Sequence, residues 1–251
     1  MNRRLGLAVG LLAVLIVSGG CLDYVTGGGE ISDDVLDAEP EAAYDWETDR
    51  NVTLMLDTGS QFRGVYNVSA NQTLRLYQPT SIGQEGPLDI SAVQFRYENG
   101  TVINGTDLRD SKHGEIDQTP DEVDVTVPAD GRLAFTAGAT PRRLTLPVYV
   151  EGSYEVILPE GSRMDFFLFS NTVPSGGTTE LVDNRVRVTW ENVESSSIMV
   201  QYYQNTDLTI FGAIIGVLSA IAVGGLYYYR RQIDRLHETR VEMGLDEEDE
   251  K

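Results

Sequence analysis

The feature that most constrains this chain is a long apolar run near its C-terminus, from Leu208 to Tyr229. No charged residue interrupts the run, and its 22 residues would rise about 33 Å as an α-helix. The hydrocarbon core of a bilayer is about 30 Å thick, so the run predicts a transmembrane helix over 208–229. The alternative is a buried helix of a soluble core, where an uncharged run of this length is rare.

The charges around this run predict how the chain crosses the membrane. Asp207 precedes the run. Four arginines follow it: Arg230, Arg231, Arg235 and Arg240. Because positive residues favour the cytoplasmic side, residues 230–251 are predicted to form a cytoplasmic acidic tail, and the long N-terminal part is predicted to lie outside the cell membrane. Three consecutive tyrosines at 227–229 are typical of a membrane–water interface.

Small residues recur at every fourth position of the predicted span, which puts them on one helix face. They are Gly212, Gly216, Ala220 and Gly224. Such a face allows close approach of a second helix, which predicts a transmembrane partner helix or a homodimer. Glycine is also common in membrane helices without a partner, so that alternative stays open.

The N-terminus reads as an export signal over residues 1–20. Arg3 and Arg4 precede an apolar stretch, and small residues lead up to Cys21. Cys21 is the only cysteine of the chain, and it stands where a lipoprotein box places the lipidated residue. We therefore predict lipidation at Cys21. A plain cleaved signal and an uncleaved N-terminal anchor are the alternatives.

Between the two ends the pattern is that of β-structure. Residues 22–43 are acidic and glycine-containing and predict a flexible tether. From Tyr44 onward, short alternating runs are separated by turn signals such as Asn99-Gly100 and Asp183-Asn184. Pro147 in one of these runs indicates an edge strand or a bend.

This pattern predicts an all-β ectodomain with an antiparallel, sandwich-like fold. Our first choice is two modules, β module 1 over 44–138 and a membrane-proximal β module 2 over 139–206. One continuous sandwich is the alternative.

The charge balance excludes some partners. The chain has 19 Lys and Arg against 39 Asp and Glu, a formal net charge of −20. Nucleic acid is not expected as a partner, because binding phosphates requires Lys and Arg. Seventeen of the basic residues are Arg and two are Lys, and with the acid excess this is typical of proteins from salt-loving archaea. A merely acidic secreted protein is the alternative.

Five Asn-x-Ser/Thr sequons are candidate glycosylation sites, and all fall in the first predicted module. They are Asn51, Asn67, Asn71, Asn99 and Asn104. Their clustering predicts that the outer part of the ectodomain carries glycans and that the membrane-proximal part does not.

Catalytic and metal-binding motifs are not recognisable. His237 falls in the cytoplasmic tail, which leaves His113 as the one histidine of the exported region, too few for a His-rich metal site. The acidic stretch Asp117–Asp124 has hard oxygen ligands for calcium but lacks the order of an EF-hand loop, and a solvated surface explains it better. We expect no cofactor, no metal and no catalytic residues.

Several segments together resemble a known family. The segments are Ser153–Pro159, Val188–Trp190, Ile198–Tyr203 and the apolar run with the following Tyr229–Ile233. They are similar to a haloarchaeal family of surface lipoproteins that is described only as a domain of unknown function, and the resemblance supplies no catalytic residues.

Two hypotheses follow. The first is a non-enzymatic, membrane-anchored cell-surface lipoprotein whose ectodomain binds a partner or organises the envelope, with membrane lipid as one partner and the extracellular ligand unknown. The second is a surface hydrolase or carbohydrate-active enzyme that uses Asp or Glu.

Overall fold

The structure is a computed structural model that describes residues 30–80 and 84–242, with side chains described up to residue 233. The chain divides into two units, Met1–Tyr203 and Gln204–Lys251. The predicted signal peptide, Cys21 and the last nine residues lie outside the described residues. We call the described part of the first unit the β domain.

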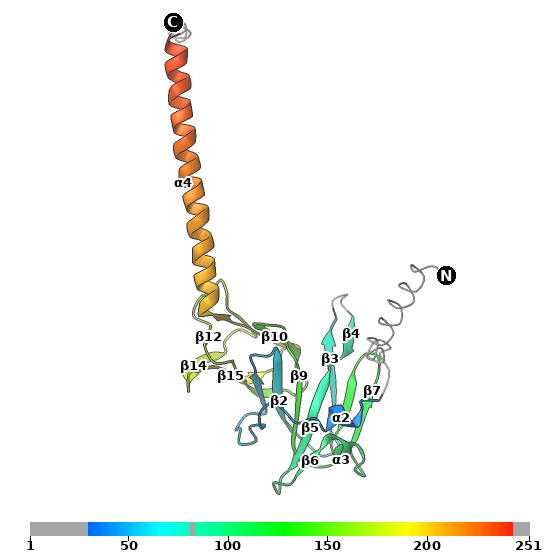
Figure 1. The fold of residues 1–251 in the computed structure, drawn as a ribbon. Helices are drawn as coiled ribbons and strands as arrows, with labels where there is room; N and C mark the ends of the chain where they lie inside the picture. The colour runs from blue at the N-terminus through cyan, green and yellow to red at the C-terminus, as the bar shows by residue number, and fades with distance from the viewer. Residues whose placement is uncertain (1–29, 81–83, 243–251) are drawn as a thin grey trace, which may run out of the picture. The chain divides into compact units, whose positions relative to one another are not determined.

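The β domain is built mainly from strands, with two short helices (Figure 1). The strands are β1 (Val52–Leu56), β2 (Gln61–Val68), β3 (Thr73–Pro79), β4 (Glu85–Pro87), β5 (Ile90–Tyr97), β6 (Val102–Asn104), β7 (Glu115–Gln118), β8 (Val123–Thr126), β9 (Gly131–Gly138), β10 (Arg143–Pro147), β11 (Gly152–Ile157), β12 (Ser162–Arg163), β13 (Asn171–Val173), β14 (Thr178–Val182), β15 (Arg185–Val193), β16 (Ser197–Gln201) and β17 (Tyr203–Gln204). The helices among the described residues are α2 (Asp33–Leu36), α3 (Gly105–Arg109) and α4 (Asn205–Glu242). The all-β prediction is confirmed.

One eight-stranded sheet runs through the β domain in the order β14-β15-β11-β1-β2-β9-β5-β6. Its neighbours are antiparallel except for β1 and β11, which pair in parallel, with Val52 opposite Tyr154 and Met55 opposite Ile157. This parallel pair joins strands from the two halves of the sequence into one sheet. The two modules predicted over 44–138 and 139–206 are therefore corrected to the alternative, one continuous domain.

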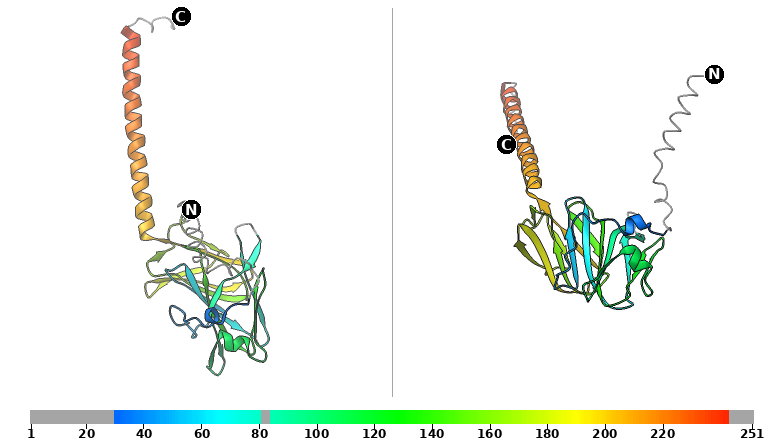
Figure 2. Two further views of the ribbon diagram at one scale, coloured as in Figure 1. Left: turned by 45° about the vertical axis from the view of Figure 1, so that its right-hand side comes forward. Right: turned by 60° about the horizontal axis from the view of Figure 1, so that its bottom comes forward.

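Figure 2 shows the strands of the β domain from two further sides. Two smaller sheets, β4-β3-β8-β7 and β10-β16-β13, share a single hydrophobic core with the large sheet. Alternate residues of β3 and β8 point into this core, including Leu74, Leu76 and Val125. Tyr149 links the layers, because its ring lies near both Tyr66 and Tyr77 and its hydroxyl donates to the Tyr77 carbonyl at 2.6 Å. Each fully buried aliphatic side chain contributes about 1.5–3 kcal/mol to folding.

The predicted turns are confirmed where glycine or asparagine residues allow left-handed backbone. Asp183 and Asn184 have φ of 50° and 61° and form the two-residue connection between β14 and β15. Gly100 has φ of 86° in the turn between β5 and β6. Pro147 ends β10, which is an edge strand, as predicted.

The N-terminal segment of the β domain is packed onto the sheet rather than free. Leu36 in α2 is fully buried in the core, and Tyr44 is buried against β9. The Arg63 guanidinium binds the carbonyls of Ala42 and Ala43 at 3.1 and 2.8 Å. The prediction of a flexible tether over 22–43 is therefore wrong for residues 30–43, which pack onto the sheet. Residues 22–29 lie outside the described part.

In the second unit, the described residues after Gln204 form the helix α4. Residues Asn205–Ile233 form a stretch with mean hydropathy 2.2 and no buried part, long and apolar enough to cross a membrane. This finding confirms the helix that was predicted over 208–229. The observed helix α4 extends beyond this run at both ends. Around Gly212, Gly216 and Gly224 the space is open.

Candidate functional site

A polar cleft lies at one end of the large sheet, where β2 and β5 end and β9 begins. Its volume is about 670 Å³ and it is open to solvent. Its lining includes Trp46, Glu47, Asn67, Arg96, Tyr97 and Arg132. Sequence analysis did not identify this cleft, because its residues come from three strands and the segment before β1.

A glycine brings the two strands at the floor of the cleft close together. Gly131, the first residue of β9, lies between Val68 of β2 and Tyr97 of β5. A Cβ atom at this position would approach the Arg96 carbonyl oxygen to 2.3 Å, and ring carbons of Phe95 to 2.8 and 3.2 Å. A larger residue would therefore push β9 away from β5 and change the floor of the cleft.

Two arginines fix the rim of the cleft. Arg132 donates from Nη1 to the Trp46 carbonyl and from Nη2 to the Thr48 carbonyl, the latter at 2.6 Å. Arg96 forms an ion pair with Glu47 at 2.8 Å. The hydrogen bond and charge of Arg96 lower the pKa of Glu47 below its ordinary value. The segment that carries Trp46 is thus held against the strand ends.

A second clamp holds the same segment a few residues earlier. Arg63 binds Asp57 through Nε and Nη2, both at 2.9 Å, and also holds the carbonyls of residues 42 and 43. Tyr44 donates its hydroxyl to the Ala92 carbonyl at 2.6 Å, and burial raises the pKa of Tyr44 to about 12. Trp46 packs edge-on against Tyr44, with ring centroids 5.7 Å apart.

The cleft combines aromatic rings with polar groups. Trp46 and Tyr97 are half-buried, and Asn67, Glu98 and Asp130 are exposed around them. Both arginines are already engaged with the protein, so the groups that remain for a ligand are amide, hydroxyl, carboxylate and aromatic faces. This set is suited to a neutral ligand with many hydroxyl groups, because rings with a polar edge offer an apolar face and a hydrogen bond together.

Four of the five predicted glycosylation asparagines are exposed, and three of these four lie close to the cleft. Asn67 lines the cleft, Asn71 is in the turn after β2, and Asn99 is next to the lining residue Glu98. Asn71 has φ of 60°, which is a conformation that asparagine tolerates well. The exposed side chains of Asn71 and Asn99 have room for a bulky modification, whereas a glycan at Asn67 would occupy the cleft.

The remaining two sequons are engaged in structural contacts. The Asn51 side chain accepts hydrogen bonds from the Ser153 amide and hydroxyl at 3.1 and 2.9 Å, and the sequon threonine Thr53 is buried. Asn104 caps α3 by accepting from the Asp107 amide at 3.0 Å. A glycan at either position would displace these contacts.

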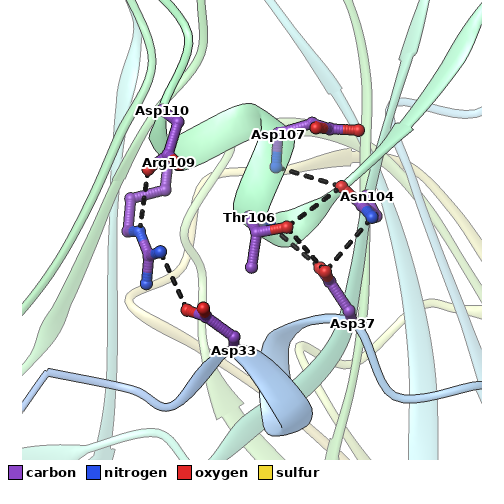
Figure 3. A network of polar contacts seen from close by, with 7 residues as sticks. All are labelled: Asp33, Asp37, Asn104, Thr106, Asp107, Arg109 and Asp110. Atoms are coloured by element: carbon purple, nitrogen blue, oxygen red, sulfur yellow. Dashed lines mark hydrogen bonds and ion pairs between the residues drawn. The ribbon is translucent and has the colours of Figure 1, made fainter.

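The contacts of Asn104 belong to a network that joins α2 to α3 (Figure 3). Asp37 accepts from the Asn104 amide at 3.1 Å and from the hydroxyl of the sequon residue Thr106 at 2.6 Å. On the other side of α3, Arg109 binds Asp33 at 2.8 Å. The network holds the N-terminal segment to the edge of the sheet.

The structure does not gather a metal site from the predicted acidic stretch. Asp117 and Asp124 lie opposite each other on β7 and β8. Burial, and then the nearby Glu122, raise the pKa of Asp124 above its ordinary value. Within residues 30–80 and 84–242, no group of three His, Cys, Asp or Glu side chains could hold a metal ion. His113 is exposed in the turn before β7.

The fold defines a class of protein: a β-rich domain continued by one helix that could cross a membrane. The chain belongs to the family of unknown function DUF5803, which matches residues 48–248 and so includes both the domain from β1 onward and α4. No curated protein and no solved structure matches the chain.

Proposed function

We propose that this chain is a single-pass membrane protein of the cell surface whose β domain binds a saccharide outside the cell. The observation that carries the proposal is the exposed apolar stretch Asn205–Ile233, which follows the last strand of the β domain directly. A helix of this length and hydropathy is stable in lipid, and its exposed apolar surface is unfavourable in water.

The orientation and the second anchor are parts of the same proposal. The arginines after the span favour a cytoplasmic C-terminus. The N-terminal signal pattern and Cys21 support export and lipidation, and the haloarchaeal resemblance supports a role at high salt. At molar salt the Debye length falls to about 3 Å, so repulsion within a chain of net charge −20 is screened.

The two anchors are tested by washing membranes with alkaline carbonate. Three variants are compared with the parent: Cys21→Ser, a chain that stops after Tyr203, and the combination of both. Each single variant is expected to stay with the membrane, and the combination is expected in the wash. Release of the truncated chain alone would contradict lipidation, and release of Cys21→Ser alone would contradict α4 as an anchor. Retention of the combination would show a third attachment, such as an uncleaved N-terminal signal.

The proposed binding activity rests on the cleft. Trp46 and Tyr97 provide aromatic faces, and the exposed amide and carboxylates provide hydrogen-bond partners. Glu47 does not suit the role of a glycosidase acid, which requires a raised pKa, because Arg96 lowers the pKa of Glu47.

Saccharide binding is tested with the full-length protein in detergent and neutral oligosaccharides from the cell envelope. Of the two tryptophans, Trp46 lines the cleft, whereas Trp190 is buried with its indole nitrogen bonded to the Pro174 carbonyl. Binding is expected to change Trp46 emission, and the change is expected to disappear in Trp46→Phe. Glu98→Gln should weaken binding, and Glu194→Gln, outside the cleft, should not. Equal loss in both glutamate variants, or no binding by the parent, would refute the assignment.

A further inference from the structure

An apolar loop of the β domain is exposed to solvent. In the segment Met164–Ser170, Phe167 is 79% exposed and Leu168 is 57% exposed. Among the described residues of the β domain, no other two large apolar side chains this exposed are adjacent in sequence. Exposed apolar patches of this kind in soluble surroundings are unfavourable and mark interaction sites.

The loop holds these side chains in a fixed turn. The amides of Phe169 and Ser170 both donate to the Phe166 carbonyl, at 3.0 and 3.1 Å. The Ser170 hydroxyl bonds the carbonyls of Met164 and Phe166 at 2.7 and 3.0 Å. Phe166 packs against both Phe167 and Phe169. The exposure therefore belongs to a structured turn, which limits the ordering needed to bind a partner.

The turn is attached to the last residue of the β domain. Tyr203 donates its hydroxyl to Asp165 at 2.5 Å, and its ring lies 6.0 Å from that of Phe169. Tyr203 precedes Asn205, where α4 begins, by two residues. The chain length between them limits their separation to about 7 Å, so the turn lies close to the point where the chain leaves the β domain.

From these contacts we infer that the Phe166–Phe169 turn inserts into the bilayer interface, with membrane lipid as its partner. The inference rests on the proposed membrane anchorage by α4. The helix α4 starts two residues after Tyr203, and Tyr203 contacts the turn. If α4 crosses the membrane, the lipid surface therefore lies near the turn and is an apolar partner for it. Phe and Leu side chains partition favourably into that region, and the turn would fix the β domain at a defined height on the membrane.

The test measures where a nitroxide label at the turn resides. Full-length protein in a Cys21→Ser background is reconstituted in vesicles of phosphatidylcholine and phosphatidylglycerol. Labels are attached at Leu168→Cys in the turn, at Val102→Cys as an exposed apolar control on β6, and at Leu218→Cys in α4. Collisions with oxygen, which concentrates in lipid, are compared with collisions with a water-soluble nickel complex. Phe167→Cys repeats the measurement with an independent variant.

The ratio of oxygen to nickel collisions is expected to be several-fold higher at 168 than at 102, and intermediate between 102 and 218. An equal ratio at 168 and 102, with a lipid-like value at 218, would contradict insertion of the turn into lipid but not anchorage by α4. A label at 168 that is shielded from both reagents would show that protein covers the turn, and this result would also contradict its insertion into lipid. A water-like value at 218 would contradict the anchorage and the insertion together.

Discussion

Replacing Arg63 with methionine is expected to loosen the N-terminal segment and to destabilise the whole β domain. The Arg63 side chain is 6% exposed and binds Asp57, whose side chain is 15% exposed, through two hydrogen bonds. Arg63→Met keeps much of the side-chain volume but leaves the Asp57 carboxylate and two backbone carbonyls without these donors. A partly buried charge without its partner is costly because water cannot solvate it fully.

Breaking a buried ion pair by removing one partner costs about 3–5 kcal/mol. Urea unfolding of the solubilised full-length chain at constant salt measures this loss. With a urea m-value of about 2 kcal/mol/M, the midpoint should fall by about 1.5–2.5 M. Trp46 emission should respond as well, since the same segment carries it to the cleft.

The matched control is Arg50→Met. Arg50 also pairs with a carboxylate, Glu191 at 2.8 Å, but the Glu191 side chain is 85% exposed and stays solvated without its partner. An exposed pair contributes about 0–1 kcal/mol, so the midpoint should move little. Asp57→Asn combined with Arg63→Met should recover part of the loss, because the unpaired charge is then absent. If Arg63→Met destabilises no more than the control, the clamp is not an energetic support of the fold.

Three further predictions concern other parts of the chain. The raised pKa of Asp124 means that the folded state favours the protonated carboxyl, so the contribution of this residue to stability is lost as the pH rises. Asp124→Asn should therefore raise the urea midpoint slightly at neutral pH. Denaturation series across pH should show that this gain vanishes below the ordinary aspartate pKa of 3.8. Intact-mass and peptide analysis of native protein should find glycan at Asn71 and Asn99 and none at Asn51 or Asn104; glycan at Asn51 would contradict the structural role of its side chain. If the small-residue face of α4 pairs with a second copy, Gly216→Leu should lower the dimer fraction in membrane cross-linking, whereas Val217→Leu on the neighbouring face should not.

Features fixed by local sequence were predictable. Alternation of valines with polar residues identified β8, and Asp183-Asn184 identified a hairpin connection whose backbone angles suit asparagine. The uncharged run from Leu208 predicted the core of α4 because composition and length alone decide whether a helix can cross lipid. Each of these inferences needs only neighbours within a few residues.

Features that depend on distant partners were not predictable. The pairing of β1 with β11 brings residues about a hundred positions apart into register, and no local pattern specifies it. Leu36 stands nearly alone in an acidic segment, so its burial was hidden by the composition around it. The cleft was missed because Arg132 reaches a segment 86 residues earlier to form its rim.

The most direct test of the account is a map of which parts of the chain face the outside of intact cells. A membrane-impermeant thiol reagent is applied to cells that carry Val102→Cys in the β domain or Lys251→Cys at the C-terminus, with the parent chain showing any reaction at Cys21. The account predicts labelling at 102 in intact cells and at 251 only after lysis. Labelling at 251 in intact cells, with 102 protected, would contradict the proposed surface location of the β domain.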